Sequence, residues 1–268
     1  MERSQGEAKE PPNREGIAAI ARCYQGFDPA MYLRYNYTPP RADFTRTDSI
    51  VPWKLACLHQ AFTEGESHTL VDVGSGPTLY QVLSGCEVFG RVVLTDFLEA
   101  NRRELQRWLA GEQGSFDWTP YLQHVCQLEG RRAFPLTFQL VLPIDVHQPC
   151  PLPPGSLPAS GADCLVSSFC LESVSPDVAS FTAALRRMGS LLRPGGHVLL
   201  IGALGESYYM AAPNVRIPVV PLDEAQVCSS LKVSGLSLLR LCVYTLPPDM
   251  RVGVDDVSGI FFVKARKP

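Results

Sequence analysis

The sequence predicts an α/β fold in which seven strands form one mostly parallel sheet covered by helices on both faces. From residue 69 onward, short apolar segments of strand length alternate with longer segments whose apolar residues recur at helical spacing. Such alternation is typical of a parallel sheet, and nearly continuous apolar strands indicate burial on both faces. No helix-like segment separates the last two strands, so we expect a C-terminal antiparallel hairpin joined by residues 247–258.

The predicted elements of the core follow one another without an internal repeat. Each strand is a short run rich in Val, Leu, Ile and Phe, and each helix carries an apolar stripe. The strands are expected at residues 69–74, 91–97, 138–146, 163–171, 195–204, 236–246 and 259–267. The helices between them are expected at residues 77–85, 98–112, 118–130, 178–192 and 222–235.

Three further helices are expected before the first strand. Residues 17–27 and 28–37 have apolar residues at roughly helical spacing, and Asp28 followed by Pro29 is typical of an N-cap with proline in the first helical position. A longer amphipathic helix is expected over residues 52–65.

One domain is expected to follow a short tail. Residues 1–15 are charged and contain few apolar side chains, so we expect them to be disordered. The remaining chain is long enough for one sizeable core. We therefore predict a single domain over residues 16–268, with residues 16–51 as an N-terminal helical cap and residues 52–268 as the core.

Composition and charge predict a small-molecule partner. The chain has a net charge of −3, from 24 Lys and Arg against 27 Asp and Glu, and no basic stretch of the kind that binds nucleic acid. The 9 cysteines are scattered without zinc-ligand spacing, so we expect reduced thiols and no metal. Neither a signal-peptide pattern nor an apolar run of about 18 residues is present. We expect a cytoplasmic monomer that binds no membrane.

A glycine-rich turn follows the first strand, in the stretch TLVDVGSGPTLYQV at residues 69–82. In an open α/β sheet, the first strand-to-helix turn commonly holds a cofactor beyond the carboxyl ends of the strands. A phosphate-binding loop would require GxxxxGK[ST], which is absent, and a dinucleotide fingerprint would require a third glycine where Leu79 stands. Triphosphate chemistry is therefore disfavoured, and a dinucleotide is weakened as an interpretation.

Acidic residues around this turn favour a different cofactor. Asp96, which stands 20 residues after Gly76 at the end of the second strand, suits the ribose of a dinucleotide or of a nucleoside. Asp72 precedes the glycines, and Asp145 in LPIDV is placed to reach an adenine amino group. These features resemble the S-adenosylmethionine methyltransferase pattern, in which Gly74 and Gly76 let the backbone approach the methionine portion. For Asp72, a structural role in the loop is at least as good an interpretation.

Longer stretches make the resemblance specific. They occur in order along residues 17–266 and read YLRYNYTPPR, PWKL, DVGSGPT, TDFLEANRREL, LPIDVHQP, SSFCLESVSPD, LLRPGGHVLLIGAL and GVDDVSGIFF. Together they resemble the small-molecule amine N-methyltransferases, which include the nicotinamide and indolethylamine N-methyltransferases. The resemblance implies a Rossmann-like class I S-adenosylmethionine-dependent methyltransferase fold with an N-terminal cap. It also implies methyl transfer to the amine of an aromatic ethanolamine such as noradrenaline, a step of catecholamine biosynthesis.

The resemblance implies two sets of site residues. The cofactor set closes tyrosines of the cap over the donor and lines its methionine, ribose and adenine portions. It comprises Tyr24, Tyr32, Tyr37, Gly74, Ser75, Gly76, Thr78, Asp96, Phe97, Asn101, Asp145, Val146, Ser168 and Cys170. The acceptor set surrounds the aromatic ring and the amine. It comprises Asn36, Arg41, Ile50, Lys54, Phe169, Glu172, Glu206, Tyr209 and Asp255.

Three acids of the acceptor set carry the expected catalysis. Only a neutral amine can attack the methyl group, so the site needs a proton acceptor as well as an anchor. We expect Glu172 to take the proton directly or through a water, Glu206 to hold the amine, and Asp255 to supply a longer-range charge. Asn36 and Phe169 are expected to sandwich the ring.

Other functions stay open on the sequence alone. An NAD-dependent oxidoreductase would suit Asp96 but lacks the third glycine. A ligand-binding protein without catalysis would keep the glycine turn and lose the acids. Within the family, tryptamine or nicotinamide could be the acceptor, although the neutral ring of nicotinamide has no need of an acidic pocket.

Overall fold

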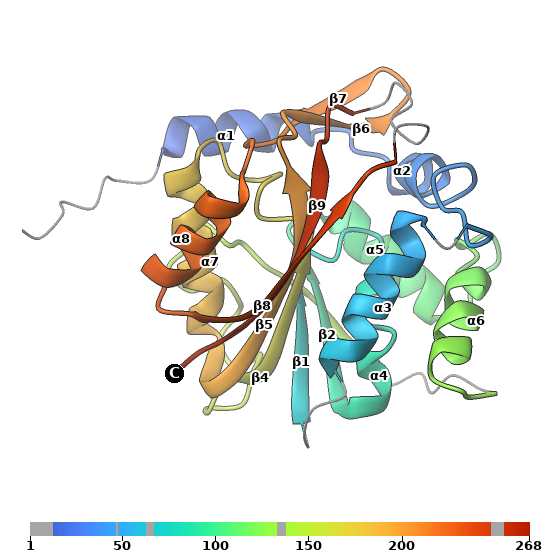
Figure 1. Cartoon of the computed structure of the whole chain (residues 1–268), viewed down its shortest axis with the longest axis horizontal. Coiled ribbons are helices and arrows are strands. Elements are labelled where there is room, and N and C mark those ends of the chain that lie inside the picture. Colours follow the sequence, from blue (N-terminus) through green and yellow to red (C-terminus); the bar gives the residue numbers. More distant parts are fainter. Residues whose placement is uncertain (1–12, 47, 63–66, 133–137, 248–254) are drawn as a thin grey trace, which may run out of the picture.

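The computed structural model describes residues 13–46, 48–62, 67–132, 138–247 and 255–268. A seven-stranded sheet has the order β3-β2-β1-β4-β5-β9-β8 and runs through the middle of the molecule (Figure 1). The strands are β1 (Ser67–Val73), β2 (Phe89–Asp96), β3 (Phe138–Pro143), β4 (Ala162–Ser168), β5 (Leu192–Leu204), β8 (Ser237–Thr245) and β9 (Gly259–Arg266). Strands β1 to β5 pair in parallel, whereas β9 pairs antiparallel with both β5 and β8. The predicted mostly parallel sheet with its C-terminal antiparallel hairpin is confirmed.

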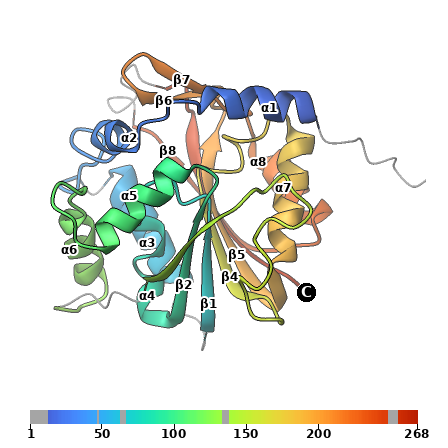
Figure 2. The ribbon, with the colours of Figure 1, turned by 180° about the vertical axis from the view of Figure 1, so that it is seen from behind.

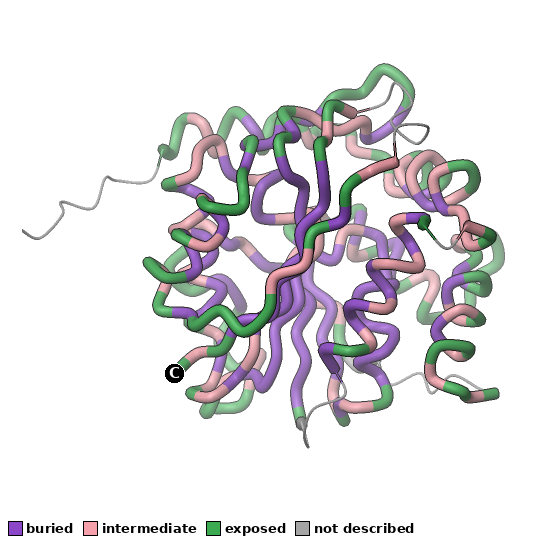
Figure 3. Tube along the Cα trace, in the orientation of Figure 1, coloured by how far each residue is buried: buried purple, intermediate pink, exposed green. Residues whose placement is uncertain are grey.

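Helices form a layer on each face of the sheet (Figure 2). The described helices of the core are α3 (Ile50–Phe62), α4 (Gly85–Val88), α5 (Glu99–Leu109), α6 (Thr119–Leu128), α7 (Val178–Ser190) and α8 (Glu224–Val233). Alternate residues of β1 point to opposite faces, so Leu70 packs with the α3 and α6 layer and Val71 packs with the α7 and α8 layer. Burial on both faces explains why the central strands are almost wholly buried in Figure 3.

The N-terminal helices lie over the carboxyl ends of the parallel strands. Helix α1 (Arg14–Cys23) and helix α2 (Pro29–Asn36) sit at the same end of the sheet as a small hairpin of β6 (Tyr208–Ala212) and β7 (Val215–Pro218) (Figure 1). As predicted, the Asp28 side chain caps α2 by accepting from the backbone N–H groups of Ala30 and Met31, with Pro29 in the first helical position. These segments cover the end of the sheet at which a ligand is expected.

Several predicted boundaries are wrong. The helix expected at residues 77–85 is replaced by a 3₁₀ turn, η1 (Tyr80–Val82), and by the short α4, because side chains of the glycine turn hydrogen-bond locally and interrupt the helix. The hairpin β6–β7 was not predicted. Helix α7 ends at Ser190, two residues early, and β5 starts at Leu192, before the Pro-Gly-Gly segment.

Parts of two predicted segments, the N-terminal tail and the loop before β9, lie outside the described residues. The predicted tail lies mainly outside the described residues, and α1 begins at Arg14. The division into a cap and a core stays a prediction, as does the loop 247–258, most of which is not described. Across the described ranges, no helix is long and apolar enough to cross a membrane. The same ranges contain no group of three or more His, Cys, Asp or Glu residues that could hold a metal ion.

Candidate active site

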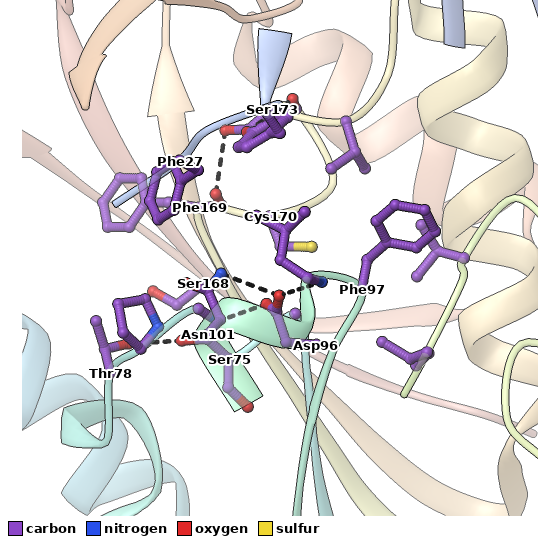
Figure 4. Close-up of a pocket in the computed structure, with 18 of the residues that line it drawn as sticks. Phe27, Ser75, Thr78, Asp96, Phe97, Asn101, Ser168, Phe169, Cys170 and Ser173 are labelled. Atoms are coloured by element: carbon purple, nitrogen blue, oxygen red, sulfur yellow. Dashed lines mark hydrogen bonds between the residues drawn. The ribbon is translucent and has the colours of Figure 1, made fainter. Parts of the chain in front are cut away.

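Asp96 organises the glycine turn at the end of β1. Its carboxylate accepts hydrogen bonds from the backbone N–H groups of Gly76, at 2.8 Å, and Leu98, at 2.8 Å, and from the Asn101 side chain, at 3.0 Å (Figure 4). Burial raises the pKa of Asp96, and these donors oppose that rise. A carboxylate has about four acceptor positions, so one remains for a ligand hydroxyl.

The same corner presents an unsatisfied acceptor. The Oδ1 atom of Asn101 is buried and has no hydrogen-bond partner among the described residues. Leaving such an atom unpaired costs about 1–3 kcal/mol, so the site is more stable with a donor bound there. A ribose with adjacent hydroxyls supplies donors to Asn101 and Asp96 together. This arrangement fits the nucleoside portion of a cofactor.

Glycine is needed at the two positions of the turn for different structural reasons. Gly76 has φ of +58°, and a Cβ added there would meet no protein atom within 4 Å, because the position faces the open cavity. Gly74 has φ of +71°, and its added Cβ would lie 2.1 Å from the sulfur of Cys170. The predicted close backbone approach to the methionine portion therefore suits Gly76, whereas Gly74 is constrained by the packing of Cys170.

A buried amide that sequence reasoning missed supports the turn from below. The Gln81 side chain donates to the carboxylate of Asp72, at 2.6 Å, and to the carbonyls of Thr78, at 3.1 Å, and Ser75, at 3.3 Å. Its oxygen accepts from the Thr78 hydroxyl at 3.0 Å. Burial raises the pKa of Asp72 to about 7. Asp72 is fully buried and bonded to Gln81, which agrees with the structural role considered for it.

Tyrosines at the N-terminal helices α1 and α2 also line the cavity. The Tyr24 hydroxyl donates to the carbonyl of Ser173 at 3.2 Å and accepts from the Tyr209 hydroxyl at 3.3 Å. Tyr32 and Tyr37 lie 3.5 Å apart at their hydroxyls, and their rings are tilted against each other. The Tyr24 contacts join the C-terminal end of α1 to β6 and to the loop after β4, and the ring of Tyr32, on α2, packs edge-on against that of Tyr209.

Every residue of the predicted cofactor set lines this first cavity. Phe97 lines this cavity and is 57% exposed, so its ring is accessible to a flat ligand group (Figure 4). The Asp145 carboxylate accepts from the backbone of His147 at 2.8 Å. Sequence reasoning missed further wall residues, namely Ile17, Ile20, Ala21, Phe27, Pro77, Leu98, Ile144, His147, Ser173 and Val174. In the sequence, these are apolar residues at core spacing or residues in loops, and ordinary packing produces the same pattern.

A second cavity adjoins the first. Eight members of the predicted acceptor set line it, namely Asn36, Arg41, Ile50, Lys54, Phe169, Glu206, Tyr209 and Asp255. The two cavities share Phe169, which follows β4 and has φ of +52°, an uncommon conformation that places the ring between them. A group in the first cavity can therefore meet a group in the second.

The acids of the second cavity are electrostatically coupled. Burial raises the pKa of Glu206 to about 9, and Asp255 and Glu172 add to this effect. Asp255 lies 3.6 Å from Arg41 and accepts from the backbone N–H of Met210 at 3.0 Å. Burial also raises the pKa of Asp255, while Arg41 lowers it. The cavity therefore gains from a cation that enters beside Glu206.

Glu172 is placed differently from the expectation. It lines neither cavity, and its Oε1 accepts from the backbone N–H of Ala203, a residue of β5, at 3.1 Å. Burial raises its pKa to about 7. The position of this side chain therefore disfavours direct contact with an acceptor in the second cavity. Its electrostatic effect on Glu206 shows that the two acids lie near each other.

The fold and the shared cavity define the class of protein. The chain has the fold of S-adenosylmethionine-dependent class I methyltransferases: a crystal structure of such an enzyme from Methanosarcina mazei matches with a TM-score of 0.55 and 14% identity, over 78% of this chain and 96% of that one. At this identity the match concerns the fold alone.

Sequence comparison then places the chain within a family. The model of the NNMT/PNMT/TEMT family matches residues 15–268, and the chain belongs to that family. It is 51% identical to phenylethanolamine N-methyltransferase of Sus scrofa over 96% of this chain and 94% of that protein. It is 50% identical to phenylethanolamine N-methyltransferase of Homo sapiens over 99% of this chain and 98% of that protein. The family resemblance predicted from the motifs is confirmed.

Proposed function

We propose that the protein transfers the methyl group of S-adenosylmethionine to the amine of phenylethanolamines such as noradrenaline. Family membership and the named relatives support the reaction. The observation that carries the choice of acceptor is the pair of acids Glu206 and Asp255, which line the second cavity beside the cofactor cavity. A buried acid that is short of positive charge favours a cationic amine.

The first cavity suits the cofactor portion by portion. Gly76 offers open space to the methionine end, Asp96 and Asn101 offer acceptors to the ribose, and Phe97 offers a ring face to the adenine. The bound cofactor supplies an electrophilic methyl group. The residues named here hold that group toward the second cavity, and no metal is needed in the proposal.

In the second cavity the chain must bind the acceptor as an ammonium and then remove its proton, so that the neutral amine can attack the methyl group. Glu206 carries a proton at neutral pH in the free protein, because its pKa is raised to about 9. An arriving ammonium stabilises the carboxylate, so its binding expels that proton. Glu206 then anchors the amine, and Asp255, held by Arg41 and Met210, adds a second negative charge near it.

Glu172 is assigned as the base that deprotonates the bound amine indirectly. Its pKa of about 7 suits a base at neutral pH. Because it lies outside both cavities, we propose that a water carries the proton to it. Alignment of amine and donor supplies most of the acceleration, since well-oriented groups lower barriers by roughly 7–11 kcal/mol.

Incubation with methyl-labelled S-adenosylmethionine and separate amines tests the proposal. Phenylethanolamine and noradrenaline are expected to take up label faster than tryptamine, and nicotinamide slowest. Label on nicotinamide alone would overturn the acceptor assignment while leaving the cofactor assignment intact. Absence of binding of S-adenosylmethionine by calorimetry would overturn both.

A further inference from the structure

Lys54 is a buried lysine whose amine faces the second cavity without a counter-ion. Lys54 is only 6% exposed, and its Nζ lies 4.3 Å from the ring centroid of Tyr80, 5.1 Å from that of Phe169 and 5.9 Å from that of Tyr37. Among the described residues, no carboxylate lies within ion-pair distance of this nitrogen and no acceptor is hydrogen-bonded to it. An aromatic enclosure therefore replaces the usual charged partner.

The amine is consequently short of solvation. Burial alone lowers the pKa of Lys54 to about 7. Charged side chains do face the same cavity, namely Arg34, Arg41, Asp43, Arg46, Glu206 and Asp255, but none of them offsets this effect. Glu206 in particular is neutral at pH 7, and Asp255 is engaged by Arg41. About half of the Lys54 side chains are neutral at pH 7 and carry a free lone pair.

A second buried lysine shows what is unusual about the first. Lys264, on β9, is also 6% exposed, but its Nζ donates to the carbonyl of Ala61 at 3.2 Å. Its nitrogen is thereby occupied in the core. Lys54, by contrast, opens onto a cavity of about 660 Å³. Desolvated lysines beside a ligand-sized cavity are the type that reacts with carbonyl compounds.

We propose that Lys54 is a covalent binding site for small aromatic aldehydes, which form an imine with its amine. The aldehyde ring packs against Phe169, in the position that brings its carbonyl group beside Nζ. The nitrogen lone pair attacks the carbonyl carbon, a proton moves from nitrogen to oxygen, and the resulting carbinolamine loses water to leave the C=N bond. No oxidant or reductant takes part. The adduct occupies the part of the second cavity beside Phe169, so such aldehydes are reversible inhibitors of acceptor binding.

Trapping with borohydride tests the site without any measurement of methyl transfer. The full chain is incubated with 4-hydroxybenzaldehyde at low concentration, the imine is reduced to a stable secondary amine, and the modified lysines are located by peptide mass spectrometry. At pH 7 the neutral fraction of Lys54 exceeds that of an ordinary lysine by about 10³-fold, so Lys54 is expected to carry the first adduct. Lys264 serves as the internal control and is expected to stay unmodified.

The pH dependence and two further controls complete the test. The initial rate of adduct formation at Lys54 is expected to rise through a midpoint near pH 7. Lys54→Arg keeps a positive side chain and removes the reacting amine; the labelling of its lysine side chains, counted without the N-terminal α-amino group, is expected to fall at least tenfold. On the unaltered chain, 4-hydroxybenzyl alcohol, which has the same ring without a carbonyl, is expected to slow the labelling.

Two results would overturn the proposal: adducts distributed over exposed lysines such as Lys232 with no preference for Lys54, or labelling of the Lys54→Arg variant equal to that of the unaltered chain. Because the mapping on the unaltered chain requires no variant, it decides the matter even if Lys54→Arg does not fold. A positive result would stand even if the proposed methyl transfer failed, and the reverse also holds.

Discussion

Replacing Glu206 by glutamine is expected to stabilise the fold and to weaken acceptor binding. In the native protein the pKa of Glu206 is raised from 4.5 to about 9, chiefly by burial. Between these pH values the native state holds a proton that the unfolded state has released, so rising pH removes stability at about 1.4 kcal/mol per unit. At pH 7 the cost is on the order of 3 kcal/mol. Glutamine is neutral throughout and does not incur it.

Urea unfolding at several pH values measures this difference. The gain in unfolding free energy of Glu206→Gln over the unaltered chain is expected to be under ~1 kcal/mol at pH 5 and about 5 kcal/mol at pH 8. Glu224→Gln, at an exposed position of α8, is the control and is expected to show no such trend. The same Glu206 variant is expected to bind phenylethanolamine roughly 10- to 100-fold more weakly, because a charge-assisted contact is lost. A gain that does not grow with pH would refute the assigned burial of the Glu206 charge.

Three further substitutions test the cofactor turn and the base. Gly76→Ala is expected to lower the free energy of unfolding by about 1–2 kcal/mol, because alanine is strained at positive φ, and to weaken cofactor binding strongly, as measured by calorimetry. Gly114 also has positive φ and open space around it, so Gly114→Ala is the control and is expected to lose stability without losing cofactor affinity. Gln81→Leu is expected to destabilise the fold by about 2–3 kcal/mol, because the buried Asp72 carboxylate loses its donor, and to raise the dissociation constant of S-adenosylmethionine. Unchanged cofactor affinity would rule out a role of Gln81 in positioning the glycine turn. Glu172→Gln is expected to remove the fall in kcat below pH 7, where protonated Glu172 no longer accepts a proton; a wild-type kcat across the pH range would exclude Glu172 as the base.

The succession of strands and helices along the chain could be predicted from the sequence, because periodicity and alternation reflect burial directly, whereas the order of the strands in the sheet was not predicted. Buried parallel strands read as apolar runs, and the missing helix before β9 identified the antiparallel hairpin. The interruption of the helix after β1 could not be predicted in this way. It depends on the Gln81 and Thr78 side chains meeting the backbone of the turn, which is a tertiary arrangement that leaves no periodic trace.

The site was predictable to the extent that motifs carried it. The predicted cofactor residues line one cavity, and all predicted acceptor residues except Glu172 line the other, while their individual roles stay predictions. Glu172 follows β4 as Phe169 does, but its carboxylate is bound to the backbone N–H of Ala203 in β5. Lys54 could equally have been a solvated helix residue by sequence; only the rings of Tyr80, Phe169 and Tyr37 around it reveal its burial.

A single competition experiment tests the central claim most directly. Equal concentrations of phenylethanolamine, tryptamine and nicotinamide are mixed with the protein and S-adenosylmethionine carrying a deuterated methyl group, and the products are resolved by mass spectrometry. The proposed function predicts that most of the label appears on the amine nitrogen of phenylethanolamine, and that Glu206→Gln reduces this share. Label chiefly on nicotinamide, or on no amine at all, would contradict it.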